Sequence, residues 1–228
     1  MTRTLVLFAK PPLPGVAKTR LAAELGPERA ALVAAALLAD SLALAEGLTA
    51  AADDARGPVR LVLAYTEARA WFEAAVADRW ELLAQTGADL GERLEKALGE
   101  LAPADDDATV FIGMDAPHLP RERLHQAFAM LEDQRTVLGP CDDGGYYLLG
   151  VRGAWPPGVL GDVRWSTAHA FKDTLRAFLS ARLTCAVLAG FYDVDDLAQL
   201  RRLGRDLGGM PADTLPHSRA ALREVGLA

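Results

Sequence analysis

The stretch TVFIGMDAP at residues 109–117 decides the fold that we expect for this chain. Its first four residues form an unbroken apolar run, rich in β-branched and aromatic side chains, which is typical of a strand buried on both faces. Gly113 ends the run, and Pro117 prevents regular hydrogen bonding beyond it. Asp115 is therefore held just past the carboxyl end of a central strand, where open α/β sheets bind ligands. The alternative is that Asp115 only caps the turn.

Similar apolar runs alternate with helical segments on both sides of this stretch. We predict further strands at residues 4–9, 59–65, 80–84, 136–140, 146–151 and 184–189. Caps at Thr66 and at Ser166 or Thr167 should begin two of the helices, and residues 50–58 should form an exposed loop. No linker or repeat divides the chain. The pattern predicts one three-layer α/β/α domain over residues 1–228 with a mainly parallel sheet.

Composition and charge exclude several functions. The chain has 228 residues and a net charge of −7, with a pI near 5.1, so we expect no nucleic-acid or membrane partner. The two cysteines, Cys141 and Cys185, lie in no metal-type spacing. The apolar runs at residues 5–9 and 30–39 are too short for a signal peptide and a membrane span, respectively. We expect a soluble, cytoplasmic protein.

A basic loop follows the first predicted strand. Residues 10–17 (KPPLPGVA) separate that strand from a short helix that begins near Lys18 and carries Arg20. Free backbone N–H groups of Val16, Ala17 and Lys18 would favour an anion, and the two cationic side chains would add full charges. The alternative is that Lys18 and Arg20 are solvated residues of the first helical turn. We interpret the loop as a phosphate site, although it is not a Walker A or GxGxxG sequence.

Two polar segments follow other predicted strands. In QTGADLGERL (residues 85–94), Asp89 and Glu92 have the spacing of a capping box, while Gln85 could bind a base or sugar. In CDDGGYYLLG (residues 141–150), acids, glycines and tyrosines are packed more densely than a plain turn requires.

The segment YDVDD at residues 192–196 follows the last strand. Asp195 or Asp196 could simply cap the next helix, but Asp193 is not explained that way. Asp115 and Asp193 would suffice to hold Mg²⁺ or Mn²⁺, which commonly uses one or two carboxylates together with phosphates and water. The sequence therefore predicts a nucleotide bound through a divalent cation.

Six motifs in order resemble those of the DUF2064 proteins in the GT-A superfamily of nucleotide-diphospho-sugar transferases, whose members are commonly labelled glycosyltransferases. The motifs are FAKPPLPGVAKTRL, QTGADLGERL, IGMDAPHL, GPCDDGGYYLLG, RWST and YDVDDLAQL. More distantly, KTRL is similar to phospholactate guanylyltransferases and GMDAP to molybdenum-cofactor nucleotidyltransferases. The usual glycosyltransferase DxD is absent, since Gly113 and Met114 precede Asp115.

The resemblance implies a mixed, Rossmann-like sheet of about seven strands and assigns roles to individual residues. Nucleotide binding would involve Ala9, Lys10, Gly15, Lys18, Arg20, Gln85 and Gly91. The acceptor or sugar side would comprise Asp143, Gly144, Gly145, Tyr146, Trp165, Ser166 and Thr167. Metal ligands would be Asp115 with Asp193 or Asp195, and the groups acting in catalysis would be Lys18, Arg20, Asp115 and Asp143.

Three functions remain open at this level. In nucleotidyl transfer, Lys18 and Arg20 would stabilise departing pyrophosphate. In glycosyl transfer, Asp142 or Asp143 would act as base toward a small-molecule acceptor. A non-catalytic nucleotide-binding module or partner subunit is the alternative to a transferase. His118 is a weaker metal candidate, and the chain could form a homodimer.

Overall fold

The centre of the protein is a seven-stranded sheet with the order β3-β2-β1-β4-β6-β5-β7. The computed structural model describes residues 2–50, 57–76 and 78–227. β6 runs antiparallel to both of its neighbours, and all other neighbouring strands are parallel. The strands are β1 (Arg3–Ala9), β2 (Val59–Tyr65), β3 (Trp80–Ala84), β4 (Ala108–Gly113), β5 (Thr136–Pro140), β6 (Tyr146–Arg152) and β7 (Cys185–Val187).

β1 and β4 form the middle of the sheet and are buried on both faces. Leu5 of β1 pairs in register with Leu61 of β2 and with Val110 of β4. Successive side chains point to opposite faces, so Leu5 packs in one apolar cluster and Val6 in another. This explains why these strands are continuous apolar runs, as expected for a parallel sheet covered on both sides.

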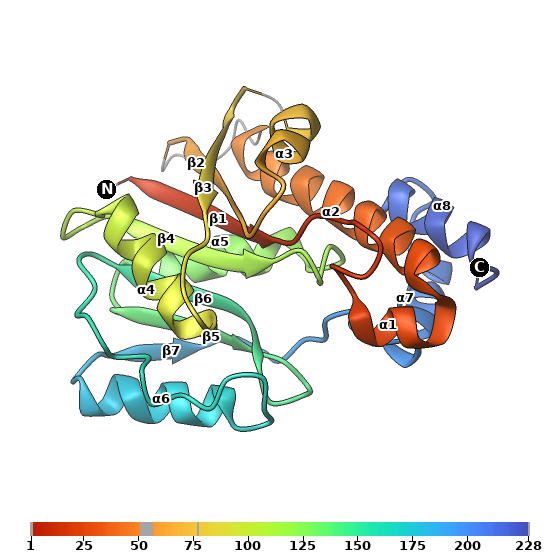
Figure 1. The fold of residues 1–228 in the computed structure, drawn as a ribbon. Helices are drawn as coiled ribbons and strands as arrows, with labels where there is room; N and C mark the ends of the chain where they lie inside the picture. Colours follow the sequence, from red (N-terminus) through yellow and green to blue (C-terminus); the bar gives the residue numbers. More distant parts are fainter. Residues whose placement is uncertain (1, 51–56, 77, 228) are drawn as a thin grey trace.

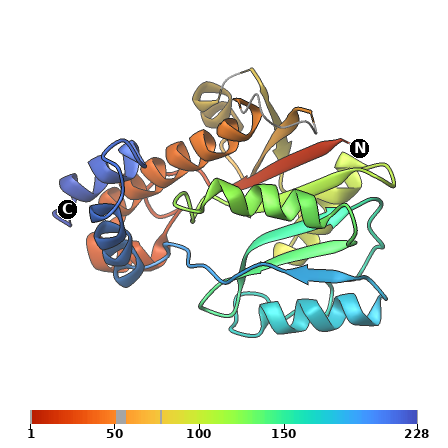
Figure 2. The same ribbon diagram turned by 180° about the vertical axis from the view of Figure 1, so that it is seen from behind.

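Helices cover both faces of the sheet (Figures 1 and 2). α2 (Pro27–Ala50), α3 (Arg69–Ala75) and α5 (Arg121–Met130) pack on one face. α4 (Leu90–Leu101) and α6 (Ala170–Ser180) pack on the other. The prediction of a three-layer α/β/α fold with a mixed, mainly parallel sheet is confirmed.

A helical group at one end of the sheet combines two helices from the first quarter of the chain with the last two helices (Figure 1). It contains α1 (Thr19–Leu25), α7 (Leu197–Gly208) and α8 (Pro216–Glu224), which pack with α2 around a third apolar cluster. The buried Asp40 of α2 accepts hydrogen bonds from the Ser218 backbone N–H at 2.7 Å and the Ser218 hydroxyl at 2.6 Å. These bonds fix α8 against α2.

α2 is apolar because it packs in two clusters. Residues 27–49 are long and apolar enough to cross a membrane by composition, with a mean hydropathy of 1.7, but 56% of the relevant window is buried within the protein. Leu38 belongs to the cluster under the sheet and Leu37 to the helical group. The composition of α2 is therefore accounted for by packing.

Strand positions agree with the sequence prediction better than helix starts do. β2, β3 and β5 have the predicted bounds, whereas α5 and β7 are shorter than predicted. The prediction that Thr66 caps α3 is wrong, because Ala68 precedes the helix in a left-handed conformation without a side-chain cap. The predicted cap at Ser166 or Thr167 is also wrong, because His169 precedes α6. Most of the predicted loop at 50–58 lies outside the described residues.

Candidate functional site

A pocket of about 540 Å³ opens at the carboxyl ends of β1 and β4. The chain leaves β1 toward β2 on one side of the sheet, and β4 lies on the other side, so this is the topological switch point where open α/β sheets bind ligands. Polar and charged side chains from five separate segments line it. They are Lys10, Lys18, Thr19, Arg20, Gln85, Arg93, Asp115, Ser166, Asp193 and Asp195.

The position of Asp115 is set by backbone hydrogen bonds beyond the end of β4. The Met114 N–H donates to the Phe8 carbonyl at 3.2 Å, which extends the pairing with β1. The Met114 carbonyl accepts a bond from the Ser41 hydroxyl of α2 at 3.2 Å. The Val194 N–H donates to the Asp115 carbonyl at 2.8 Å. Asp115 is thus held on a rigid support and placed beside the segment that carries Asp193.

The roles of the three acids after β7 are separated by the structure. Asp196 is the N-cap of α7 and forms a capping box with Gln199. Asp193 and Asp195 are not needed for this cap, and both line the pocket with Asp115. The alternatives left by the sequence are resolved in favour of Asp196 as the structural residue.

Lys18 is buried between two of these carboxylates. Its side chain is only 3% exposed, and Nζ lies 2.5 Å from Asp115 Oδ1 and 2.8 Å from Asp195 Oδ1. Burial alone would lower the pKa of Lys18, but the two carboxylates raise it above its ordinary value, so the side chain stays charged. The interpretation of Lys18 as a solvated residue of the first helical turn is wrong.

The backbone around Lys18 differs from the predicted anion site. Lys18 itself is left-handed, with φ 54°, and precedes α1 as its N-cap. The Val16 N–H, which we expected to face an anion, donates to the Leu13 carbonyl at 3.1 Å. Of the three predicted backbone donors, Val16 is therefore engaged within the loop.

Carboxylates crowd the floor of the pocket. Burial, followed by the charges of Asp195, Asp143 and Asp115, raises the pKa of Asp193 to about 7. In the described part of the chain, no group of three or more histidine, cysteine or acidic side chains is arranged to hold a metal ion. Two carboxylates, those of Asp115 and Asp195, nevertheless converge on one cation, the Lys18 ammonium. They fit a hard cation that takes its remaining ligands from phosphates and water.

Other side chains at the pocket have distinct surroundings. Neither Lys10 nor Arg20 forms an ion pair with any residue that the structure describes, so both are available to an anion. Gln85 Nε2 donates to the Ala64 carbonyl at 2.7 Å, which anchors this side chain at the ends of the strands. Ala9 also lines the pocket, whereas Gly15 does not.

A second pocket, of about 330 Å³, shares several residues with the first. Its lining includes the predicted acceptor-side residues Asp143, Gly145, Tyr146, Trp165, Ser166 and Thr167, but not Gly144. Asp143 Oδ1 accepts a bond from the Gly145 N–H at 2.8 Å, so its turn is closed locally. The neighbouring Asp142 pairs with Arg202 at 2.9 Å and lines neither pocket, which leaves Asp143 as the acid of this segment that faces the site.

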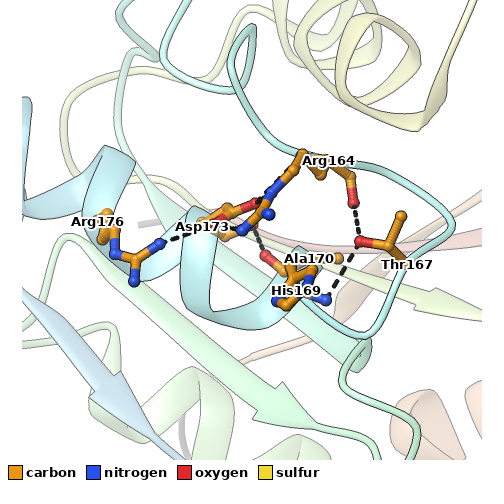
Figure 3. Close-up of polar contacts among 7 residues, drawn as sticks. Arg164, Thr167, His169, Ala170, Asp173 and Arg176 are labelled. Atoms are coloured by element: carbon orange, nitrogen blue, oxygen red, sulfur yellow. Dashed lines mark hydrogen bonds and ion pairs between the residues drawn. The ribbon is translucent and has the colours of Figure 1, made fainter.

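The segment before α6 carries Trp165 and Ser166, which line this pocket. Figure 3 shows the polar contacts that join this segment to the start of α6. Arg164 donates to Asp173 of α6 at 2.7 and 3.0 Å, and this guanidinium holds the pKa of Asp173 below its ordinary value. The Thr167 hydroxyl donates to the Arg164 carbonyl at 2.7 Å and accepts a bond from the His169 N–H at 3.2 Å. Thr167 therefore closes the turn that presents Trp165.

Two glycines that we expected at the site act by allowing close packing. A Cβ on Gly91 would lie 2.6 Å from Trp165 Nε1, so the indole rests directly on the first turn of α4. A Cβ on Gly144 would collide with the Ala168 backbone, and the Gly144 carbonyl accepts a bond from the Phe171 N–H at 2.9 Å. Both glycines shape the walls without lining the pockets.

His118 does not belong to the site. It lines neither pocket and makes tilted ring contacts with Phe191 and Tyr192, with ring centroids at 4.7 and 4.2 Å. Burial lowers its pKa to about 4, with a smaller opposing effect of Asp206. The weaker suggestion of His118 as a metal residue receives no support from this position.

Sequence reasoning missed Leu90. This side chain is 41% exposed and lines both pockets. Its signal in the sequence was an apolar residue directly after the cap Asp89, at a position where core packing does not require one. The cap itself is confirmed, since Asp89 accepts a bond from the Glu92 N–H at 2.9 Å, although Glu92 accepts from the Ala88 N–H instead of completing the box on Asp89.

The fold and the switch-point pocket define the class of this protein as an α/β protein with the nucleotide-diphospho-sugar transferase fold. A crystal structure of a "putative nucleotide-diphospho-sugar transferase" from Desulfovibrio desulfuricans matches with a TM-score of 0.81 and 29% identity, over 99% of both chains. The chain belongs to the family DUF2064, described as an uncharacterized protein conserved in bacteria, whose model matches residues 47–167.

More distant structures share the fold. Rv0371c from Mycobacterium tuberculosis, in a complex with manganese, matches with a TM-score of 0.53 and 19% identity, over 89% of this chain and 98% of that one. A CMP:2-keto-3-deoxy-manno-octonic acid synthetase complexed with CTP matches with a TM-score of 0.56 and 10% identity, over 92% and 99%. No curated protein matches this chain.

Proposed function

We propose that the protein is a metal-dependent transferase that uses an activated nucleotide as its donor. One observation carries this proposal: Asp115, Asp193 and Asp195 reach the same switch-point pocket as the cations Lys18 and Arg20, from segments far apart in the chain. Folding alone does not require a buried lysine beside three partly buried carboxylates around an open space, because charges removed from water are costly unless they are paired or bind a ligand.

The first pocket would hold the nucleotide. Arg20 and Lys10, which have no ion pair in the described part of the chain, would contact the phosphates. Gln85 and Arg93 also line this pocket and would lie near the base, as the resemblance implies. The volume of about 540 Å³ is within the range usual for small-ligand sites.

Mg²⁺ or Mn²⁺ would be held by Asp115 and by Asp193 or Asp195. When bound, such a cation neutralises charge that develops on the leaving phosphate group. The residues of this chain would orient the phosphates against it and exclude water from the reacting atoms. The manganese complex of Rv0371c, which shares the fold, supports a divalent cation as the cofactor.

Glycosyl transfer is the first of two chemistries that fit. Asp143 lines the second pocket, where a small-molecule acceptor would bind. It would accept the proton of an acceptor hydroxyl as that oxygen attacks the sugar carbon and the nucleoside diphosphate leaves. The similarity to the Desulfovibrio protein favours this chemistry.

Nucleotidyl transfer is the second. Arg20 lines both pockets without an ion pair in the described part of the chain, so it could stabilise departing pyrophosphate. An acceptor phosphate would attack the α-phosphorus of a nucleoside triphosphate. The synthetase complexed with CTP has the same fold, and at 10% identity its similarity to this chain shows nothing beyond the fold.

The test is product analysis with a panel of nucleoside triphosphates and nucleotide sugars in the presence of Mn²⁺ or Mg²⁺. Nucleoside diphosphate release indicates glycosyl transfer, and pyrophosphate release indicates nucleotidyl transfer. Asp115→Asn should abolish either product, while Asp142→Asn, next to Asp143 but outside both pockets, serves as the control. Binding without turnover that tolerates Asp115→Asn would identify a non-catalytic nucleotide-binding module instead.

A further inference from the structure

The Lys18 ammonium contacts Asp115 and Asp195, two of the three carboxylates that the proposed function offers to a divalent cation. Asp115 Oδ1 and Asp195 Oδ1 both point to Nζ, at 2.5 and 2.8 Å. The lysine side chain is 3% exposed, while the two acids are 38% and 36% exposed. A cation placed between the same two oxygen atoms must therefore displace the ammonium.

We propose that Lys18 occupies the cation position of the ligand-free protein, so that the site takes a divalent cation together with a polyphosphate and binds the free cation poorly. This inference rests on the proposed function and specifies its ligand as the complex of a divalent cation with a nucleoside polyphosphate.

The coupling between cation and polyphosphate follows from what happens to the Lys18 ammonium when it is displaced. If a divalent cation took Asp115 and Asp195 alone, the Lys18 ammonium would remain buried without an anion, which is strongly unfavourable. Lys18 also lines the nucleotide pocket, so phosphate oxygens there would give the ammonium new partners. Bound phosphates would therefore pair with the Lys18 ammonium and free Asp115 and Asp195 for the cation. The cation would in turn reduce the repulsion between these carboxylates and the phosphates.

This coupling is reciprocal by thermodynamic necessity. If a polyphosphate raises the affinity for the cation by some factor, the cation raises the affinity for the polyphosphate by the same factor, and such factors are typically about 5- to 150-fold. A site of this kind discriminates against free divalent cations without any additional residue.

Arg20 provides a matched control for simple electrostatics. It lines the same pocket and carries the same charge as Lys18, but it has no ion pair in the described part of the chain. Removing either charge makes the site more negative and attracts cations in general. Only the removal of Lys18 also frees the oxygens of Asp115 and Asp195.

The experiment measures free Mn²⁺ by electron paramagnetic resonance while the full chain is titrated with Mn²⁺ alone. We expect Lys18→Gln to bind Mn²⁺ at least about tenfold more tightly than the wild type, and Arg20→Gln less than about threefold more tightly. Adding Asp115→Asn to Lys18→Gln should remove the gain. Equal effects of Lys18→Gln and Arg20→Gln would overturn the proposal.

A second measurement on the wild-type protein covers the case in which Lys18→Gln does not fold. Thermal shifts with Mn²⁺, with inorganic tripolyphosphate and with both should show that the combined shift exceeds the sum of the separate shifts. Additive shifts would refute the coupling. If Mn²⁺ with tripolyphosphate binds but Lys18→Gln gains nothing, this inference alone fails; if no probe binds any variant, the proposed function fails as well.

Discussion

Gly91→Ala is predicted to displace Trp165 from the wall of the acceptor-side pocket. An alanine Cβ at this position would lie 2.6 Å from Trp165 Nε1 and 2.9 Å from two carbons of the ring. Favourable contacts between such atoms are about 3.5–4.0 Å long, so the ring must move by roughly 1 Å. Overpacking of this kind costs about 1–3 kcal/mol.

Gly99, in the same helix α4, is the matched control. A Cβ there would meet no atom within 4 Å, so Gly99→Ala should raise the free energy of unfolding by about 1 kcal/mol through helix propensity alone. Because both substitutions are Gly→Ala in the same helix, the gain in helix propensity is common to them, and we expect the two variants to differ by the overpacking cost of about 1–3 kcal/mol. For a chain of this size, 1 kcal/mol changes the melting temperature by about 2–4 °C, so the difference should be at least about 2 °C.

The assay is thermal unfolding, followed by circular dichroism, of both variants in the wild-type and Trp165→Ala backgrounds. Without the indole, Gly91→Ala should no longer be destabilising, because the atoms that it meets are gone. Equal stability of Gly91→Ala and Gly99→Ala in the wild-type background would refute the reasoning. So would a cost of Gly91→Ala that persists after Trp165 is removed.

Three further predictions concern charges. Lys18→Met should lower the free energy of unfolding by about 1–3 kcal/mol, because two partly exposed carboxylates lose their partner. This cost should be smaller in an Asp115→Asn background. A double-mutant cycle measured by denaturant unfolding that gives no coupling energy between Lys18 and Asp115 would contradict the ion pair. His118 has a folded-state pKa of about 4, below its unfolded value of about 6.5, so the native state loses stability as pH falls between these values, by on the order of 3 kcal/mol. In urea titrations, the free energy of unfolding of His118→Phe should therefore rise relative to that of the wild type as pH falls over this range. A difference between the two proteins that does not change with pH would disprove this. Asp196→Ala should cost about 0.5–2 kcal/mol in thermal melts through loss of the α7 cap, whereas an unchanged melting temperature would show that the cap contributes nothing.

Several features of the site could be predicted from local sequence because they depend on residues that are close together in the chain. The position of Asp115 follows from an apolar strand that ends at Gly113, and the observed β4 ends at the same residue. The Asp89 cap and the turn at Asp143 likewise use hydrogen bonds over two or three residues. Such contacts leave a direct signal in residue type and spacing.

What the sequence by itself determined was the layered α/β fold and the set of polar side chains at its strand ends, since periodicity and turn chemistry are local properties. Only the tertiary structure decided which charges meet. Lys18 and Asp195 are far apart in the chain but pair at 2.8 Å, and the backbone bond from Val194 to Asp115 brings the segment of Asp195 beside Asp115. No local pattern encodes such a meeting, because it depends on strand order and on the packing of α1 and α7 with α2 beside the sheet.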